Sequence, residues 1–201
     1  MKVRIGVGLG VAEMVSSASE FARAVDATEQ LGFDSLWMSE VAASPALDPV
    51  AALGFAAGRT SRLKLGTSIM VLSGRSPALV AQSVATLDRL TDSRFLPIFG
   101  LGTVHPDEQQ AFGISRQERG AWVEEALPLL RRFWTEDHVT HEGAHFRYHD
   151  LSIQPRPTRP VPIWLGGRAS SELRPRSWSV SHPEVVHPGA AVPPVAVQPV
   201  S

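Results

Sequence analysis

The chain has 201 residues, which at about 150 residues per domain is one domain or slightly more. Its net charge of −1 provides no basic surface for nucleic acid or for an acidic membrane. Cysteine is absent, which excludes a disulfide scaffold, thiolate zinc sites, iron–sulfur clusters and a cysteine nucleophile. No apolar run reaches the ~18 residues of a membrane span, and MKVRIGVGLG is interpreted as a strand rather than a signal peptide, so a cytoplasmic location is expected.

Apolar runs and helical patterns alternate along the chain. Asp48 and Ser76 are expected to cap helices, because each precedes a proline at the first helical position. Pro97 predicts a bulge or a strand end, and Pro128 predicts a kink or a break in a helix. Short joins between strands and helices indicate βαβ units and a parallel sheet, which is the α/β class. The expected strands are 3–9, 33–38, 63–72, 94–101 and 161–165, and the expected helices are 20–31, 49–58, 77–90 and 117–134.

Two segments depart from this alternation. Residues 139–153 alternate in polarity and carry a turn at Glu142-Gly143, which predicts a hairpin. Residues 175–201 are rich in proline and lack a helical period, so we expect an extended, poorly ordered tail. The expected domains are therefore a (β/α) unit over 1–174 and a tail over 175–201.

From the third strand onward the sequence carries motifs that resemble a known family. The segment LGTSIMVLSGRSPALVAQSVATLDRLTDSRFLPIFGLG is similar to the core of the bacterial luciferase-like monooxygenase superfamily, and LGFDSLWMSE and PVPIWLGG match in order. The resemblance covers about residues 1–174. The matching positions are Arg75, Pro77, Ala81-Gln82, Thr86-Leu87-Asp88, Arg94-Phe95, Gly100 and Gly102.

The resemblance implies a (β/α)8 TIM barrel with FMN or the deazaflavin coenzyme F-420 across the carboxyl ends of its strands, in agreement with the general rule for barrels. It also implies redox chemistry on a small-molecule substrate. Slight likeness of LGTSIM and FGLG to the deazaflavin branch favours coenzyme F-420. Family members commonly form dimers, which makes a homodimer one expected assembly.

Site residues follow from the same resemblance, position by position. The cofactor would be lined by Glu40, Ser68, Ile69, Gly102, Thr103, Gly166 and Gly167, and a non-proline cis peptide would lie between Ser68 and Ile69. Glu40 and His105 are the candidate catalytic residues, because a carboxylate and an imidazole can both carry a proton.

The sequence departs from the family pattern at two of these positions. Val41 replaces the histidine that often follows the acid at 40, and Thr103 replaces the acid of the sugar-oxidising deazaflavin enzymes. The simpler interpretations also remain open: an ordinary trans strand at Ser68, a solvated loop acid at Glu40, a surface histidine at 105 and a turn at Gly166-Gly167.

Two other patterns suggest different chemistry. Gly6-x-Gly8-x-Gly10 approaches a nucleotide-binding fingerprint, but its third glycine stands one residue too early, so a tightly packed strand end is preferred. Four histidines in the expected hairpin are compatible with a metal site, although without cysteine or an acidic cluster a solvated hairpin face is the simpler interpretation. These histidines are His138, His141, His145 and His149.

The family pattern continues beyond the last matching strand with further strand and helix units, which residues from Pro175 onward do not resemble. We therefore expect a C-terminally truncated or frameshifted barrel of about five strands that is marginally stable, oligomeric or prone to aggregation, because its sheet edges are open. Three functions remain: a flavin- or deazaflavin-dependent oxidoreductase or monooxygenase, a degenerate partial barrel that binds cofactor weakly or pairs with another subunit, and an unrelated nucleotide-binding α/β protein.

Overall fold

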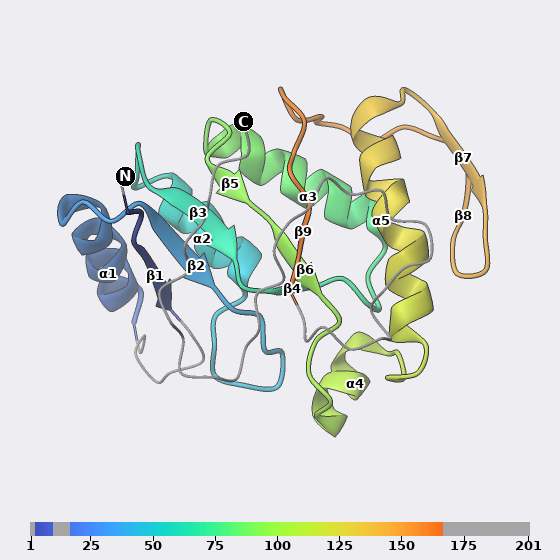
Figure 1. Cartoon of the computed structure of the whole chain (residues 1–201), viewed down its shortest axis with the longest axis horizontal. Helices are drawn as coiled ribbons and strands as arrows, with labels where there is room; N and C mark the ends of the chain where they lie inside the picture. Colours follow the sequence, from blue (N-terminus) through green and yellow to red (C-terminus); the bar gives the residue numbers. More distant parts are fainter. Residues whose placement is uncertain (1–2, 10–16, 167–201) are drawn as a thin grey trace.

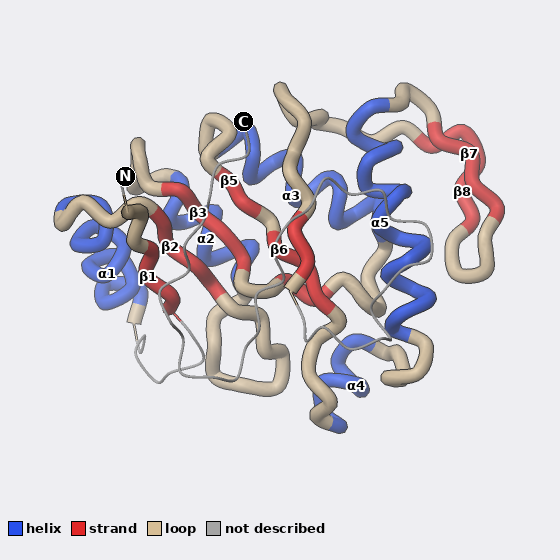
Figure 2. Tube along the Cα trace, in the orientation of Figure 1, coloured by secondary structure: helices blue, strands red, loops and turns tan. Residues whose placement is uncertain are grey.

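The computed structural model describes residues 3–9 and 17–166, and Figures 1 and 2 show their arrangement. Gly10, Gly167 and the expected tail over 175–201 lie outside the described residues. The strands are β1 (Gly6–Leu9), β2 (Ser35–Met38), β3 (Lys64–Thr67), β4 (Met70–Val71), β5 (Phe95–Leu96), β6 (Ile98–Gly100), β7 (Val139–Glu142), β8 (Arg147–Leu151) and β9 (Trp164–Leu165). The helices are α1 (Ala18–Gln30), α2 (Pro49–Ala57), α3 (Pro77–Leu90), α4 (Pro106–Phe112) and α5 (Arg119–Thr135).

The parallel strands lie side by side in the order in which the chain makes them. One sheet has the order β1-β2-β3-β5 and the next has β4-β6-β9, and the chain runs from β3 into β4 and from β5 into β6. A doubly wound nucleotide-binding sheet reverses its strand order at a switch point, whereas a barrel does not. The observed order therefore contradicts the nucleotide-binding alternative.

The third expected strand is interrupted by a bulge. Gly66 pairs with Leu96 and Met70 pairs with Phe99, so residues 67–69 face only residues 97–98 and one residue is extra. The peptide between Ser68 and Ile69 is cis, which confirms the expected bond.

The break predicted at Pro97 is confirmed between β5 and β6. Proline has no N–H to donate to the neighbouring strand. Next to it, the Thr67 side chain replaces part of the backbone hydrogen bonding between the strands. Its Oγ1 donates to the Ile98 carbonyl and accepts from the Ile98 N–H, both at 2.9 Å. The two strand breaks thus lie next to each other and are joined by one buried hydroxyl.

Ser17, Asp48 and Ser76 stand at the N-caps of α1, α2 and α3, and the first two cap their helices through the side chain. The Ser17 hydroxyl accepts a hydrogen bond from the first turn of α1, which begins two residues before the expected start. The Asp48 carboxylate caps α2 as predicted. Ser76 stands at the N-cap of α3, but its side chain makes no capping bond and lies 3.3 Å from the Tyr148 hydroxyl.

Two helical features differ from the expectations. The break predicted at Pro128 does not occur, and α5 continues through it, because this proline and Glu124, whose carbonyl loses its partner, are both on the exposed side of the helix. The predicted kink stays a prediction. Helix α4 was not expected at all. Its signals are nevertheless local: His105 at the N-cap, Pro106 in the first turn, and Gly113 with φ 64° at the end.

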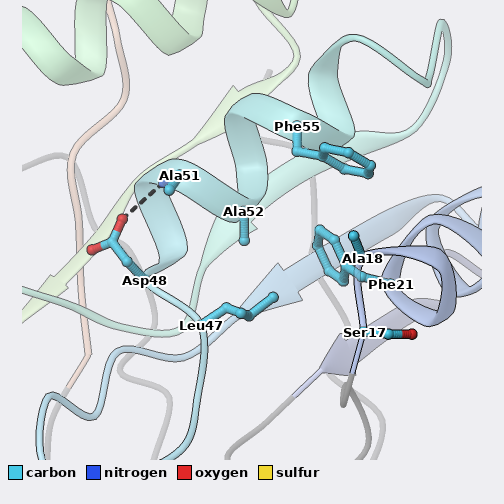
Figure 3. Close-up of a pocket in the computed structure, with 8 residues that line it drawn as sticks. All are labelled: Ser17, Ala18, Phe21, Leu47, Asp48, Ala51, Ala52 and Phe55. Atoms are coloured by element: carbon cyan, nitrogen blue, oxygen red, sulfur yellow. Dashed lines mark hydrogen bonds between the residues drawn. The ribbon is translucent and has the colours of Figure 1, made fainter.

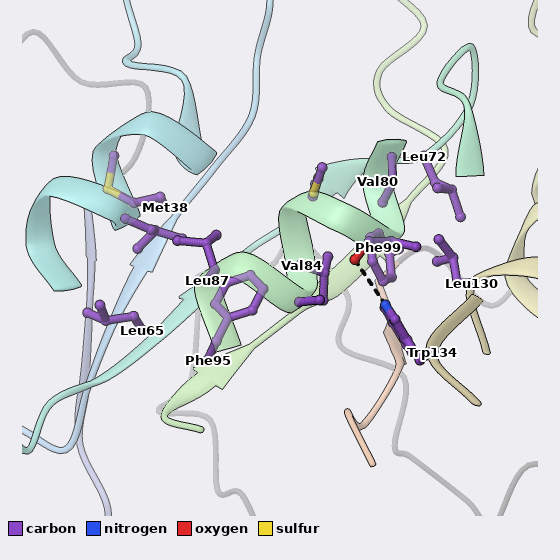
Figure 4. Packing of buried hydrophobic residues seen from close by; sticks show 14 of the residues in the cluster. Met38, Leu65, Leu72, Val80, Val84, Leu87, Phe95, Phe99, Leu130 and Trp134 are labelled. Atoms are coloured by element: carbon purple, nitrogen blue, oxygen red, sulfur yellow. Dashed lines mark hydrogen bonds between the residues drawn. The ribbon is translucent and has the colours of Figure 1, made fainter. Parts of the chain in front are cut away.

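The hydrophobic core lies between the sheet and helices α2, α3 and α5. Figure 4 shows Phe95 and Phe99 of the sheet packed against Val84 and Leu87 of α3 and their neighbours. The Trp134 indole N–H, at the same layer, donates to the Ala81 carbonyl at 3.0 Å. This helix-covered side is the outer face of the sheet.

The opposite side, which we call the inner face, is built differently. In β2, Leu36 and Met38 are buried on the outer face, whereas Trp37 is half-buried on the inner face. Its ring lies against Gly66, where a Cβ would be 2.3 Å from a ring carbon. An added Cβ would lie 2.7 Å from Trp37 Nε1 at Gly6, whereas at Gly8 it would meet no atom of the described residues within 4 Å. Among the described residues, the inner face is therefore filled by a tryptophan beside β3 and at the start of β1, and is open at Gly8.

Candidate active site

The bulge stands at the carboxyl end of β3, where the end of β2 holds it. The Ser68 N–H donates to the Met38 carbonyl at 2.7 Å, and the Ser39 hydroxyl donates to the Ser68 carbonyl at 2.8 Å. The Glu40 N–H donates to the Ile69 carbonyl at 3.1 Å. Ser68 is exposed and Ile69 half-buried, so a firmly anchored backbone segment faces outward at the strand ends.

Glu40 lies directly behind this bulge, with its side chain only 6% exposed. One carboxylate oxygen accepts from the Val71 N–H at 2.6 Å, and the other pairs with the Arg75 guanidinium. Burial raises the pKa of Glu40, and although the Val71 N–H and Arg75 oppose this, the balance stays above the ordinary value. Glu40 thus braces the bulge against the following loop and holds a proton more readily than a solvated glutamate.

Two glycines at the strand ends make room for Ile69. An added Cβ would lie 2.3 Å from Ile69 Cγ2 at Gly166 and 2.8 Å from Ile69 Cδ1 at Gly100. The Gly166 N–H donates to the Phe99 carbonyl at 2.8 Å, so it serves the sheet rather than an anion. A phosphate contact of the kind expected here would fall to Gly167, outside the described residues.

The turn after β6 is held by two buried charged side chains. Gly102 has φ 80°, and the Thr103 N–H donates to Glu108 Oε2 at 2.5 Å. Arg119 Nη1 donates to the Leu101 carbonyl at 2.9 Å and to the Thr103 carbonyl at 2.5 Å. Glu108 and Arg119 are 0% and 2% exposed. Thr103 itself is exposed beside them.

Sequence analysis did not single out Glu108 or Arg119. A signal for Arg119 exists, because it recurs at helical spacing with the buried Val123 and Leu130 and therefore falls on the apolar side of α5. A charged residue at such a position needs a buried partner. Glu108 has no comparable signal, since α4 is too short to show a period.

The two candidate catalytic residues have separate partners. His105 has a side chain 64% exposed, and its Nδ1 accepts from the Asp107 N–H at 3.3 Å. The ring therefore caps α4, while the carboxylate of Glu40 is directed at Val71 and Arg75. The structure brings Glu40, Ser68 and Ile69 together and places Gly102 and Thr103 on the adjoining turn.

The hairpin histidines are distributed among different partners. His141 Nε2 lies 2.9 Å from Glu125 Oε1, His138 pairs with Asp150 at 3.1 Å, and His145 packs on Trp122. Within the described residues, no three metal-binding side chains gather in one group.

A surface groove between α1 and α2 lies apart from these residues. Figure 3 shows Phe21 and Phe55 facing each other across it, with ring centroids 5.6 Å apart, and Asp48 directed at its own helix. Its lining is mainly apolar and includes none of the candidate site residues. The candidate site therefore lies at the strand ends and not in this groove.

A parallel sheet in chain order, helices on its outer face and loops gathered at the carboxyl ends define a protein of the (β/α)8 barrel type, of which the described residues form part. A sequence model of the luciferase-like monooxygenase family matches residues 2–193, and the chain belongs to this family. The match continues past residue 174, and the domain boundary expected there stays a prediction. Within the described residues, no helix is long and apolar enough to cross a membrane.

The similar curated proteins include F-420-dependent dehydrogenases. An F-420-dependent glucose-6-phosphate dehydrogenase from Intrasporangium calvum is 39% identical over 150 residues, covering 68% of this chain and 44% of the relative. The counterpart from Kineococcus radiotolerans is 36% identical over 166 residues, with 75% and 48% covered. This chain therefore spans about half the length of the curated relatives that it matches.

Solved structures agree with this assignment. The monooxygenase RslO1 from Streptomyces bottropensis superposes with a TM-score of 0.71 and 30% identity, over 80% of this chain and 53% of that one. An F-420-dependent secondary alcohol dehydrogenase, solved with an F-420–acetone adduct, superposes with a TM-score of 0.70 and 25% identity, over 83% and 53%.

Proposed function

We propose that this chain carries the cofactor-binding strand ends of an F-420-dependent oxidoreductase, which passes a hydride between the deazaflavin and a small alcohol or carbonyl substrate. The observation that carries the proposal is the anchored bulge at Ser68-Ile69, where Ser68 is exposed at the carboxyl ends of the strands. Similarity to F-420-dependent dehydrogenases in both sequence and structure supports the deazaflavin over FMN.

The residues present fit a flat, extended ring system. Among the described residues the inner face is open at Gly8, and Trp37 provides an aromatic surface on the next strand. The bulge offers Ile69 as an apolar contact and exposed backbone at Ser68. When bound, the deazaflavin supplies the hydride acceptor or donor of the reaction.

The side chains of the chain have distinct tasks in this proposal. Ile69 and the Ser68 backbone hold one side of the ring, and Ser39 keeps the bulge in place through its bond to the Ser68 carbonyl. The Gly102-Thr103 turn lies next to them and faces the substrate. Glu40 braces the bulge from behind, and its raised pKa suits a group that holds a proton near the ring.

The turn after β6 departs at one residue from the pattern of the sugar-oxidising enzymes. Thr103 stands where an acid is expected in the sugar-oxidising enzymes, and a hydroxyl cannot take a proton near neutral pH as a carboxylate can. His105, exposed and two residues further on, is the remaining candidate proton carrier. Glucose-6-phosphate is therefore one substrate to test beside simple secondary alcohols and ketones.

Cofactor titration of the 201-residue chain tests the proposal. We expect saturable quenching of coenzyme F-420 fluorescence and a raised melting temperature, with weaker or no effect of FMN. Preferential FMN binding would move the chain to the flavin-dependent monooxygenases. Binding of F-420 without hydride transfer to any alcohol or ketone would favour the non-catalytic partial barrel, and binding of neither cofactor would refute the proposal.

A matched pair of serine variants localises the site. Ser39→Ala removes the hydroxyl that anchors the bulge and is expected to weaken F-420 binding by about threefold to tenfold, the usual value of one hydrogen bond. Ser83→Ala removes a hydroxyl that bonds only to its own helix and should leave the affinity unchanged. Equal effects of the two variants would place the cofactor elsewhere.

A cytoplasmic location, a homodimer and a small-molecule substrate stay predictions for this chain. The dimer is checked by light scattering with and without F-420, since a shared site would couple assembly to cofactor concentration.

A further inference from the structure

Two buried charged side chains and one buried hydroxyl hold the turn at Gly102-Thr103. Its backbone gives one N–H to Glu108 and two carbonyls to Arg119, and the Leu101 carbonyl also accepts from the buried Ser73 hydroxyl at 2.9 Å. Glu108 comes from α4 and Arg119 from α5. Two helices and the loop after β4 therefore meet at one backbone turn.

The two charged side chains approach the same point of this turn. A Cβ added at Gly102 would lie 3.1 Å from Glu108 Oε2 and 3.2 Å from Arg119 Nη1. With φ at 80°, Gly102 takes a conformation that favours glycine, so the turn can bend between the two groups. The carboxylate thus accepts a hydrogen bond from an N–H group, and the guanidinium donates to carbonyl groups, of the same short backbone segment.

Stability alone does not account for this arrangement. Within the described residues, Glu108 Oε1 and Arg119 Nε and Nη2 are buried and lack a hydrogen-bond partner. Desolvating a carboxylate and a guanidinium is costly, and spare donors and acceptors add to that cost. The atoms that do have partners are those that define where Leu101 and Thr103 lie, which is the pattern expected of groups that fix position.

We infer that Glu108 and Arg119 are positioning residues of the active site, which set the Gly102-Thr103 turn against the bound deazaflavin and its substrate. This inference rests on the proposed function for the identity of the cofactor. The hold on the turn itself rests only on the hydrogen bonds and burial given above. Neither side chain needs to touch the cofactor, because both act through the backbone of the turn.

The first arm of the test is hydrogen exchange in the cofactor-free chain. Glu108→Met and Arg119→Met are expected to speed exchange over residues 101–104 by about tenfold, since each removes charge-assisted hydrogen bonds. Glu108→Gln keeps an acceptor and Arg119→Lys keeps a cation, so both should recover part of the protection. Faster exchange spread evenly over the chain, or none, would overturn the inference.

A control variant separates positioning from general destabilisation. Asp88 is another buried carboxylate, 2% exposed, at the end of α3 beside Ser93. Asp88→Ala removes the acceptor of the Ser93 hydroxyl and should lower the melting temperature, but it should leave exchange at 101–104 unchanged relative to the rest of the chain.

The second arm measures F-420 affinity and the absorption maximum of the bound cofactor. Arg119→Met is expected to weaken binding about tenfold or more and to shift the maximum, with partial recovery in Arg119→Lys, because small displacements of positioning groups have large effects. Asp88→Ala should change neither. A local effect on exchange with unchanged affinity and spectrum would overturn the active-site role. If the wild-type chain binds neither F-420 nor FMN, the proposed function fails, while the exchange arm still decides whether the two residues hold the turn.

Discussion

The two ends of the parallel sheet treat charged side chains differently. At the amino end, Arg59 pairs with Asp26, and both side chains are about one-third exposed, at 39% and 32%. Glu29 accepts from the backbone N–H groups of residues 61–63, and Arg94 donates to the Thr60 and Leu63 carbonyls. These groups are partly solvated and hydrogen-bonded to their surroundings, and Asp88, which is buried at the same end, accepts a hydrogen bond from the Ser93 hydroxyl.

At the carboxyl end the charges are buried. Glu40, Glu108 and Arg119 are each less than 9% exposed, and the last two retain buried atoms without partners in the described part of the chain. Buried charge is a weak source of stability and a good means of fixing geometry. The difference indicates that the amino end holds the fold together and the carboxyl end holds a site, as is general for (β/α) barrels.

The largest effect should come from two phenylalanines that lie on opposite sides of the Pro97 break. Phe95 and Phe99 are 1% and 0% exposed, and truncation of either to alanine is expected to cost about 3–5 kcal/mol in free energy of unfolding. Urea denaturation measures both losses.

Cofactor affinity then separates the two variants. Phe99 stands next to Gly100, against which Ile69 packs, so loss of its ring should disturb this strand end, and Phe99→Ala should weaken F-420 binding as well as stability. Phe95→Ala should reduce stability alone, measured at a temperature where the variant stays folded. Weaker F-420 binding in Phe95→Ala would contradict the distinction between an amino end that maintains the fold and a carboxyl end that holds the site.

The sequence predicted the repeating plan of the sheet well, because each strand and helix carries its own periodicity and caps. Asp48 before Pro49 and the interruption at Pro97 are examples in which one residue decides the local structure. The breaks within the strands were harder to predict from the sequence. A strand over 63–72 looks continuous by hydrophobicity, and its bulge depends on pairing with a neighbour thirty residues away.

The site was predicted in outline through its resemblance to a family, but the tasks of its residues required the fold. Glu40 was expected to face the cofactor, yet its carboxylate bonds to Val71 and Arg75 behind the bulge. Gly166 was expected to line the cofactor, yet its lack of a side chain makes room for Ile69. Sequence spacing cannot show such tertiary neighbours.

A second prediction compares two glycines with positive φ. Gly113→Ala has φ 64° and open space around the new methyl group, so it should cost only about 1–2 kcal/mol for the backbone conformation. Gly102→Ala pays the same conformational cost and in addition presses on Glu108 and Arg119, which raises the expected loss to about 2–4 kcal/mol.

Denaturant unfolding gives both values, and F-420 titration gives the functional counterpart. We expect weaker cofactor binding in Gly102→Ala and unchanged binding in Gly113→Ala. Equal stability losses in Gly102→Ala and Gly113→Ala would mean that Glu108 and Arg119 move aside at little cost. Such a result would contradict a firmly held turn.

The smallest expected effect is a difference in pH dependence between two glutamates. Burial raises the pKa of Glu40, so the folded state binds this proton more tightly than the unfolded chain. The resulting stabilisation is full at pH values below the ordinary glutamate pKa and is lost as pH rises through the raised folded value. Glu40→Gln stays neutral, so it should gain stability relative to wild type over that rise.

Glu125 provides the opposite case on α5. Burial acts to raise its pKa, but His141 and the backbone N–H groups of His145 and Phe146 outweigh it, and the pKa is lowered. Its stabilisation is therefore present above the ordinary glutamate pKa and is lost as pH falls through the lowered folded value. Glu125→Gln should consequently be less stable than wild type near neutral pH and approach it in acid. Thermal unfolding of the three proteins between acidic and neutral pH measures both slopes, and slopes of the same sign would show that Glu40 is not the buried, proton-holding group on which its proposed role depends.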